Sequence, residues 1–379
     1  MTGAPAHHSG RSFRNPWPNA RPQGLLGLLR WVVVERLTRQ RRADPSPAAF
    51  PRVPPAFDAP RAAPGRLTAT WVGQSTFLLQ IGGYNVLTDP VWGRRASPVS
   101  FAGPARWVPP GIDFDALPPV DLVLVSHDHY DHLDKPTVRR LAERFPAAVW
   151  LAPLRLGDWL RARGVRVVRE ADWWDVASVL GPPHAPQAQH APQSAAPPGG
   201  PSVGTLPDSP QAPAPEPGDA AQSVAVQVTC VPAQHFSGRW AVGRNTTLWC
   251  GWALHAGGRR VLFTGDTGRH PEFAAIAGRC GPFDLVLVPI GAYEPRWFMR
   301  PVHMNPEDAV AVYAELCGPT FTAPPRPLLA AMHWGTFKLT DEPMDEPPRR
   351  MRAAWRSAGF DDRSLWVPAH GETRVVTGG

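Results

Sequence analysis

The chain has 379 residues, 43% of them hydrophobic, which is enough to bury a substantial core in one large domain or two small ones. Its formal net charge of +7 lies in residues 1–66, which hold 11 Arg against three acidic residues, and the remainder is close to neutral. The four cysteines are far apart and form no C-x-x-C pair, so the sequence indicates neither a zinc ribbon nor a disulfide framework and fits a reducing interior.

Residues 1–66 form a basic, Pro-rich N-terminal arm. The arm either meets an anionic partner, lipid or nucleic acid, or is a solvated Arg-rich tail. Its apolar segment, residues 25–34, is interrupted by Arg30 and is far shorter than the roughly 20 residues of a membrane-spanning helix, so it can lie on a bilayer but not cross one. Residues 1–21 do not resemble a secretory signal, and we expect a cytoplasmic protein with peripheral contact at the inner face of the membrane.

Residues 67–379 alternate apolar runs with amphipathic helical patterns, which predicts an α/β domain. Residues 76–81 and 84–88 flank Gly82 and Gly83, a pattern typical of a β-hairpin. Residues 121–125 predict a buried strand, and helical spacing begins at Val138. An insert at 181–222 interrupts the domain; its positions 181–220 hold 12 Pro and no aromatic residue, so we expect it to be disordered.

Polar side chains follow several predicted strands directly. The strand at 121–125 leads into His127, and the same order recurs at 260–264 before Asp266, 285–290 before Tyr293, 328–332 before His333 and 365–369 before His370. Reactive groups in α/β sheets gather beyond the carboxyl ends of the strands, so these separate strand ends predict one shared site.

The sequence H-D-H-Y-D-H packs three imidazoles and two carboxylates into residues 127–132. His127 and His129 project to one side of an extended backbone, while the turn into the next helix directs Asp131 and His132 toward a neighbouring point, so we expect two adjacent metal ions. Imidazole and carboxylate without thiolate favour zinc, although iron and manganese remain open. The alternative is a polar loop of chance composition.

One loop does not complete two metal sites, so further ligands are expected at other strand ends. His235 in P-A-Q-H-F, Asp266 in T-G-D-T-G and His333 in A-M-H-W-G fit that description. Each alone is more often a structural residue, but together with the loop they indicate a metal centre.

Long stretches of the sequence resemble the metallo-β-lactamase superfamily, and more closely the N-acylphosphatidylethanolamine-hydrolysing phospholipase D family. The resemblance rests on F-R-N-P-W-P at 13–18, L-R-W at 29–31, V-S-H-D-H-Y-D-H-L-D at 125–134, F-D-L-V-L-V-P-I-G-A-Y-E-P-R-W-F-M at 283–299, H-W-G-T-F at 333–337 and H-G-E at 370–372. It implies an αββα sandwich of two mixed sheets flanked by helices.

The resemblance also implies a division of the ligands. His127, His129 and His235 are expected to hold one zinc ion, Asp131, His132 and His333 the other, and Asp266 is expected to bridge them. Asp89 is implied as a carboxylate that fixes a ligand imidazole from outside; equally, it is a turn residue before Pro90.

The family likeness implies a phosphodiesterase of phospholipase D type that releases N-acylethanolamine and phosphatidic acid, together with a phospholipid substrate, membrane contact and a homodimer. A metallo-hydrolase of a soluble phosphorylated metabolite or lactone is the alternative. A nucleic-acid phosphodiesterase has only the basic arm in its favour, so we expect no nucleic-acid partner.

Three further residues are candidates for roles in the reaction. His303 precedes a helix predicted from Asn305 and Pro306, where it either contacts the substrate and its leaving group or is a surface histidine. Val302 and Asn305 depart from the family pattern, which puts head-group contacts in doubt. Tyr130 either faces the reaction centre or packs beneath the loop, and His370 is more often structural than catalytic.

Overall fold

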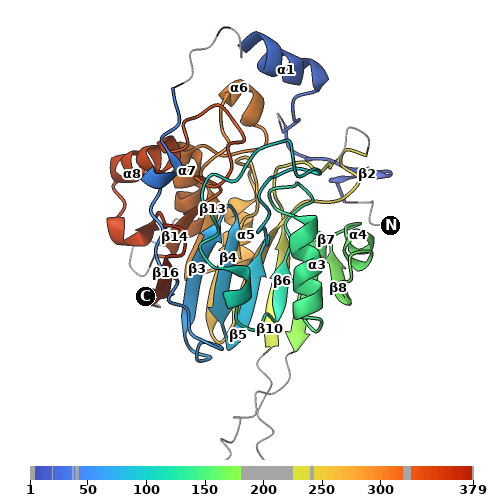
Figure 1. Ribbon diagram of the computed structural model, residues 1–379, viewed down its shortest axis with the longest axis vertical. Coiled ribbons are helices and arrows are strands. Elements are labelled where there is room, and N and C mark those ends of the chain that lie inside the picture. Colours follow the sequence, from blue (N-terminus) through green and yellow to red (C-terminus); the bar gives the residue numbers. More distant parts are fainter. Residues whose placement is uncertain are drawn as a thin grey trace, which may run out of the picture.

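A computed structural model describes residues 5–18, 20–35, 38, 42–180, 225–239, 243–318 and 326–377. The predicted insert at 181–222 lies outside these residues. Two seven-stranded sheets form the centre of the described chain (Figure 1). The first sheet has the order β16 (Thr373–Val376), β3 (Leu67–Gly73), β4 (Thr76–Ile81), β5 (Tyr84–Thr88), β6 (Leu122–Leu124), β7 (Val149–Pro153) and β8 (Val167–Ala171). The second has the order β15 (Leu365–Trp366), β14 (Leu328–Met332), β13 (Leu285–Pro289), β12 (Arg259–Phe263), β11 (Gly251–Ala256), β10 (Ala225–Val231) and β9 (Val176–Leu180).

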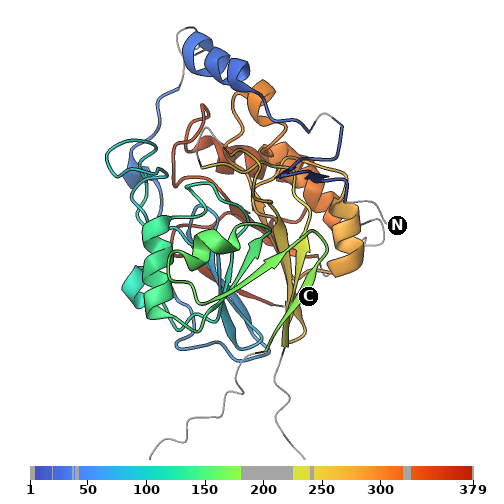
Figure 2. The same ribbon diagram turned by 90° about the vertical axis from the view of Figure 1, so that its right-hand side faces the viewer.

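Helices cover the outer faces of the two sheets, and Figure 2 shows the resulting four layers from the side. The helices beside the first sheet are α3 (Lys135–Arg144) and α4 (Gly157–Arg161), and those beside the second are α5 (Phe273–Cys280), α7 (Pro306–Cys317) and α8 (Glu346–Ser357). Shorter elements are α1 (Leu25–Leu29), α6 (Arg296–Met299), the π-helix η1 (Arg30–Glu35) and the 3-10 helices η2 (Pro47–Ala49), η3 (Phe114–Ala116) and η4 (Asp362–Ser364). The predicted αββα sandwich is confirmed.

Alternation of side chains along the strands builds two cores. Phe77 and Leu79 of β4 point into the core between the sheets, whereas Leu78 points into the core under α3, because successive residues of a strand face opposite sides. In α3, Val138 and Leu141 fill this outer core. The Asp134 side chain accepts a hydrogen bond from the Thr137 amide and so caps the start of the helix, shortly after the H-D-H-Y-D-H stretch at 127–132.

The predicted hairpin between β4 and β5 is confirmed, and the two strands pair antiparallel. Gly82 and Gly83 form its turn with φ of 61° and 82°, in the left-handed region that favours glycine. A Cβ atom on Gly82 would lie 2.7 Å from the Cβ of Ala256 in the other sheet, so this position also requires glycine for lack of space.

The parallel strands of both sheets place their carboxyl ends along one edge of the sandwich. Strands β5 to β8 are parallel neighbours in the first sheet, and β12 to β15 are parallel neighbours in the second. The predicted strand at 365–369 is wrong in length, since β15 ends at Trp366. Pro368 has no amide hydrogen to continue the ladder, and His370 instead donates its amide hydrogen to the Pro51 carbonyl oxygen.

The beginning of the N-terminal arm is folded against the domain. Strands β1 (His8–Ser9) and β2 (Ser12–Phe13) form a small hairpin whose Phe13 is buried in the core between the sheets. The Nε2 atoms of His7 and His8 lie 2.6 and 2.7 Å from the two carboxylate oxygens of Asp172. This part of the arm is therefore anchored, and the solvated-tail alternative is wrong for it.

Candidate metal centre

The loop that contains the H-D-H-Y-D-H motif, residues 125–132, follows the end of β6. Backbone hydrogen bonds toward both sheets fix its start. The Val125 amide continues the pairing to Leu151 of β7, and the Cys250 amide donates to the Ser126 carbonyl oxygen across the sandwich. The His129 carbonyl oxygen then accepts from the amides of His132 and Leu133, which forms the turn into α3. Because of this turn, His127 and His129 belong to one group of candidate ligands and His132 to a second, neighbouring group.

The first group of candidate ligands consists of His127, His129 and His235, whose ligand atoms lie within 4.8 Å of one another. The His127 Nε2 atom lies 2.9 Å from His129 Nδ1, and His235 Nε2 lies 3.2 Å from the same atom. His235 comes from the segment after β10, so two separate strand ends supply this group.

The second group consists of Asp131, His132, Asp266 and His333, again within 4.8 Å. Asp266 Oδ2 lies 3.0 Å from His132 Nε2 and 2.9 Å from His333 Nε2. Asp131 Oδ2 lies 3.2 Å from both of these nitrogens. Asp266 also forms a close group with His235 and His303, so it lies between the two sets, where the family resemblance implied a bridging ligand. All seven predicted ligands therefore come together.

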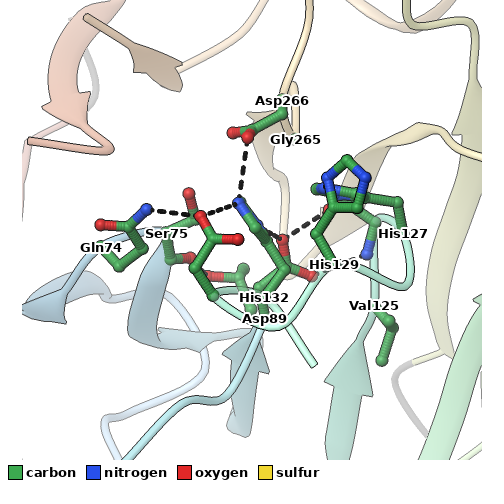
Figure 3. A network of polar contacts seen from close by, with 12 residues as sticks. Gln74, Ser75, Asp89, Val125, His127, His129, His132, Gly265 and Asp266 are labelled. Atoms are coloured by element: carbon green, nitrogen blue, oxygen red, sulfur yellow. Dashed lines mark hydrogen bonds and ion pairs between the residues drawn. The ribbon is translucent and has the colours of Figure 1, made fainter. Parts of the chain in front are cut away.

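Hydrogen bonds from outside determine which ring nitrogens carry hydrogen (Figure 3). The Ser126 hydroxyl donates to Asp89 at 2.5 Å, so it accepts from His127 Nδ1 at 2.8 Å. His132 Nδ1 donates to Asp89 Oδ2 at 2.7 Å, and His235 Nδ1 donates to the Val302 carbonyl oxygen at 2.9 Å. The Nε2 atoms of His127, His132 and His235 consequently present lone pairs to the cluster. Asp89 has the outer role that the resemblance implied.

The pKa values of the first group favour neutral imidazole. Burial lowers the pKa of His235 to about 3 and that of His129 to about 4. Burial, reinforced by the neighbouring histidines, also holds the pKa of His127 well below its ordinary value. Neutral imidazole is the form that binds a metal ion.

In the second group, neighbouring carboxylates raise the pKa of histidine instead of leaving it lowered by burial. Burial alone lowers the pKa of His333, but Asp266 and Asp131 outweigh it and raise the pKa to about 9. Burial raises the pKa of Asp266, yet His132 and His333 outweigh it and hold the pKa well below its ordinary value. In both pairs the nearby opposite charge stabilises the charged form. The carboxylates of this group thus attract positive charge at the point where the ligand atoms meet.

The donor set fits a pair of divalent cations. The Nε2 atoms of His132 and His333 meet carboxylate oxygens, so this point holds positive charge, either as protons on the rings or as a metal ion that replaces them. Asp266 Oδ1 and His333 Nδ1 are buried and have no hydrogen-bond partner within the described part of the chain. Imidazole and carboxylate without thiolate suit zinc, and the same ligand types admit iron or manganese.

The three candidates for catalysis lie in different surroundings. His303 is buried beside the cluster, with Nδ1 3.8 Å from Asp266 Oδ2 and without a hydrogen-bond partner among the described residues. The helix predicted after it is confirmed as α7, and Asn305 and Asp308 form a capping box at its start. The surface-histidine alternative is therefore wrong.

Tyr130 makes its side-chain contacts with Arg239, outside the ligand cluster. Its hydroxyl donates to the Arg239 carbonyl oxygen at 2.9 Å, and the Arg239 guanidinium lies 4.1 Å from its ring centre. Of the two alternatives for Tyr130, these contacts favour packing over a role in the reaction. The His370 ring packs tilted against Trp71, with ring centres 4.2 Å apart, and its Nε2 lies 3.1 Å from Thr336 Oγ1, so His370 belongs to the surrounding structure rather than the cluster.

Two residues that contact the ligands were not predicted from the sequence. Asn15 from the arm makes two hydrogen bonds with the backbone of His235. Its Nδ2 donates to the His235 carbonyl oxygen at 2.9 Å, and its Oδ1 accepts from the His235 amide at 3.2 Å. Gln74, between β3 and β4, donates from Nε2 to Asp131 Oδ2 at 2.8 Å. Neither residue is of a metal-ligating type, so composition gave no signal for them.

Comparison with known proteins places these residues in a wider context. The family model described as the beta-lactamase superfamily domain matches residues 84–334, a stretch that contains all seven candidate ligands. An uncharacterized protein of Mycobacterium tuberculosis (strain ATCC 25618 / H37Rv) is 40% identical over 356 residues, covering 93% of this chain and 79% of that protein.

A relative with a named activity is the N-acyl-phosphatidylethanolamine-hydrolyzing phospholipase D 1 of Caenorhabditis elegans. It is 34% identical over 293 residues, covering 76% of this chain and 69% of that protein. Among solved structures, the isothiocyanate hydrolase from Delia radicum gut bacteria has a TM-score of 0.52 at 18% identity, covering 81% of this chain and 98% of that one. This last likeness is one of fold alone.

Proposed function

The chain belongs to the beta-lactamase superfamily as a metallo-hydrolase, and from that premise we propose that it is a binuclear zinc phosphodiesterase of phospholipase D type. The proposed substrate is an N-acylphosphatidylethanolamine-like lipid, and the proposed products are N-acylethanolamine and phosphatidic acid. The observation that supports this proposal best is the pairing of two adjacent ligand groups with 34% identity to the nematode enzyme.

The seven ligands have the chemistry for two ions. His127, His129 and His235 would hold one, and Asp131, His132 and His333 the other, with Asp266 between them. Two zinc ions supply activated water at neutral pH and neutralise charge on phosphoryl oxygens. The outer carboxylate of Asp89 keeps His132 in the tautomer that directs Nε2 inward.

His303 has the position for contact with the substrate. Its ring centre lies 5.0 Å from that of His235 and 5.4 Å from that of His333, while Nδ1 stays unpartnered among the described residues. We propose that His303 hydrogen-bonds the oxygen that leaves from phosphorus, where a proton must arrive as the P–O bond breaks.

Apolar side chains near α1 and α6 support contact with a lipid surface. Leu26 is 83% exposed and Val34 is 53% exposed, and Trp31 packs against Phe298 of α6 at 5.1 Å. Within the described ranges, no helix is long and apolar enough to span a bilayer. We propose that the face carrying these side chains lies on the membrane, with its arginines toward anionic head groups.

The proposed reaction is tested by isotope incorporation. Purified, metal-loaded protein is mixed with vesicles of N-acylphosphatidylethanolamine in water enriched in oxygen-18, and the products are identified by mass spectrometry. Water adds its oxygen to phosphorus and its hydrogen to the leaving ethanolamine oxygen. The label is therefore expected in phosphatidic acid and absent from N-acylethanolamine.

Parallel incubations with a soluble phosphorylated metabolite or a lactone in place of the vesicles separate the alternatives. Hydrolysis of a soluble phosphodiester or lactone without any turnover of the lipid would replace the lipid substrate by a soluble one. Label in a released fatty acid would show attack on an ester or amide carbonyl carbon rather than phosphorus and would end the phospholipase D assignment.

Contact with membranes is tested by sedimentation with vesicles that contain anionic lipid. Leu26→Glu is expected to reduce binding, because it places a charge on the proposed bilayer face. Val176→Glu in β9 is the matched control, since Val176 is 61% exposed but lies on a strand outside this face. Equal binding of wild type and Leu26→Glu would contradict the proposed surface. The expected homodimer remains a proposal that light scattering can test.

A further inference from the structure

Gln74 lies in the short link between β3 and β4, beside the second ligand group (Figure 3). Its side chain is 1% exposed. The backbone adopts φ of +53°, a left-handed conformation that residues other than glycine rarely adopt. Such a conformation persists only where surrounding contacts impose it, and the contacts of Gln74 are accordingly numerous.

The side chain of Gln74 orients one ligand. Its Nε2 donates to Asp131 Oδ2 at 2.8 Å, the same oxygen that lies 3.2 Å from His132 Nε2 and from His333 Nε2. An amide donor on this oxygen fixes the rotation of the carboxylate and draws away part of its charge. Asp131 therefore presents its oxygen to the ligand cluster in one orientation.

The backbone of Gln74 holds a second ligand. Its carbonyl oxygen accepts from the His333 amide at 3.0 Å and from Trp71 Nε1 at 3.0 Å. Its own amide donates to Thr336 Oγ1 at 2.7 Å, and that hydroxyl meets His370 Nε2 at 3.1 Å. One residue thus links the β3–β4 turn to the segment that carries His333.

We propose that Gln74 is a positioning residue that selectively sets the affinity of the Asp131–His132–His333 half of the centre for its metal ion. Gln74 makes no hydrogen bond to His127, His129 or His235 among those found in the described chain, so the other half is expected to be little affected. This inference rests on the proposed binuclear centre.

The test compares metal retention in three variants of the full chain loaded with zinc. Gln74→Met keeps the length of the side chain and removes the donor. Gln74→Asn tolerates positive φ but is one methylene too short to reach Asp131. Gln80→Met is the matched control, because Gln80 is also 1% exposed and hydrogen-bonded, at the opposite end of β4, to Asp58 and Asn85.

Each protein is dialysed against a series of zinc buffers, and bound zinc per chain is measured by mass spectrometry beside its circular dichroism spectrum. Both Gln74 variants are expected to lose one of two ions at roughly 10- to 100-fold higher free zinc than wild type. Gln80→Met is expected to keep both while its melting temperature falls. Loss of both ions together in the Gln74 variants, or retention of both at wild-type free zinc, would overturn the inference. A wild-type protein that binds no zinc would instead refute the proposed function.

Discussion

Replacement of Asn15 by alanine tests whether the N-terminal arm supports the metal centre. Asn15 makes reciprocal hydrogen bonds with the backbone amide and carbonyl of His235, at 3.2 and 2.9 Å, and its Oδ1 also lies 3.2 Å from Trp249 Nε1. Trp249 Nε1 also donates to the Ala233 carbonyl oxygen at 2.9 Å, so it keeps a partner after the change. Asn15→Ala removes the two bonds to His235 and also the bond from Nδ2 to the Ala20 carbonyl oxygen, at 2.8 Å.

The expected loss follows from these bonds of Asn15. A typical intramolecular hydrogen bond contributes about 1 kcal/mol net, and a buried backbone group left without a partner costs about 1–3 kcal/mol. Because Asn15 is only partly buried, water replaces part of what is lost, and we expect the free energy of unfolding to fall by about 2 kcal/mol. That is a large share of the roughly 5–15 kcal/mol by which domains are stable.

Urea denaturation monitored by tryptophan fluorescence measures this loss. The neighbouring Arg14→Ala is the control. Arg14 is exposed and, among the described residues, its guanidinium bonds only the Ala6 carbonyl oxygen, so its effect should stay within about 0.5 kcal/mol. Zinc affinity should fall with Asn15→Ala because His235 is a candidate ligand. A variant as stable as Arg14→Ala, with wild-type zinc affinity, would refute the role assigned to the arm.

Three further outcomes are expected. Asp89→Asn keeps the shape but removes the charge that holds His132, so zinc affinity in chelator competition should fall roughly 10- to 100-fold, and an unchanged affinity would contradict the outer role of Asp89. His303→Gln should keep the zinc content while kcat falls roughly 10²- to 10⁴-fold; zinc loss would instead make His303 a ligand. Burial lowers the pKa of His7 below 6.5, so the stabilisation of the folded arm is complete above pH 6.5 and is lost as pH falls through the lowered pKa. Proteolysis of the arm should therefore become faster as the pH is lowered from about 7.5 to about 5. A rate that does not change with pH would contradict the stabilising role of neutral His7.

The sheets and the seven ligands followed from local sequence patterns. At β6, β12 and β14, a buried strand followed by histidine or aspartate predicts a side chain at the shared site. This holds because parallel strands place their carboxyl ends along one edge of the sheet. Likewise, Asn305 and Pro306 predicted the start of α7, since a helix start requires capping groups next to one another in sequence. Such signals depend on only a few adjacent residues.

The supporting contacts could not be predicted in this way. Asn15 reaches His235 across 220 positions, and Gln74 reaches Asp131 across 57, through amide groups that are common in any turn. The direction of Tyr130 depends on Arg239, which lies 109 positions away. Only the packing of distant segments fixes these contacts, so the sequence left the role of Tyr130 open and gave Asn15 and Gln74 none.

Metal content is the most direct test of the central claim, that seven converging side chains hold a pair of cations. The purified chain is analysed for zinc, iron and manganese by mass spectrometry beside Asp266→Ala, which removes the carboxylate between the two groups. We expect about two ions per chain, zinc foremost, and near-complete loss of lipid hydrolysis in the variant. A metal-free wild-type preparation that turns over its substrate at full rate would contradict the account.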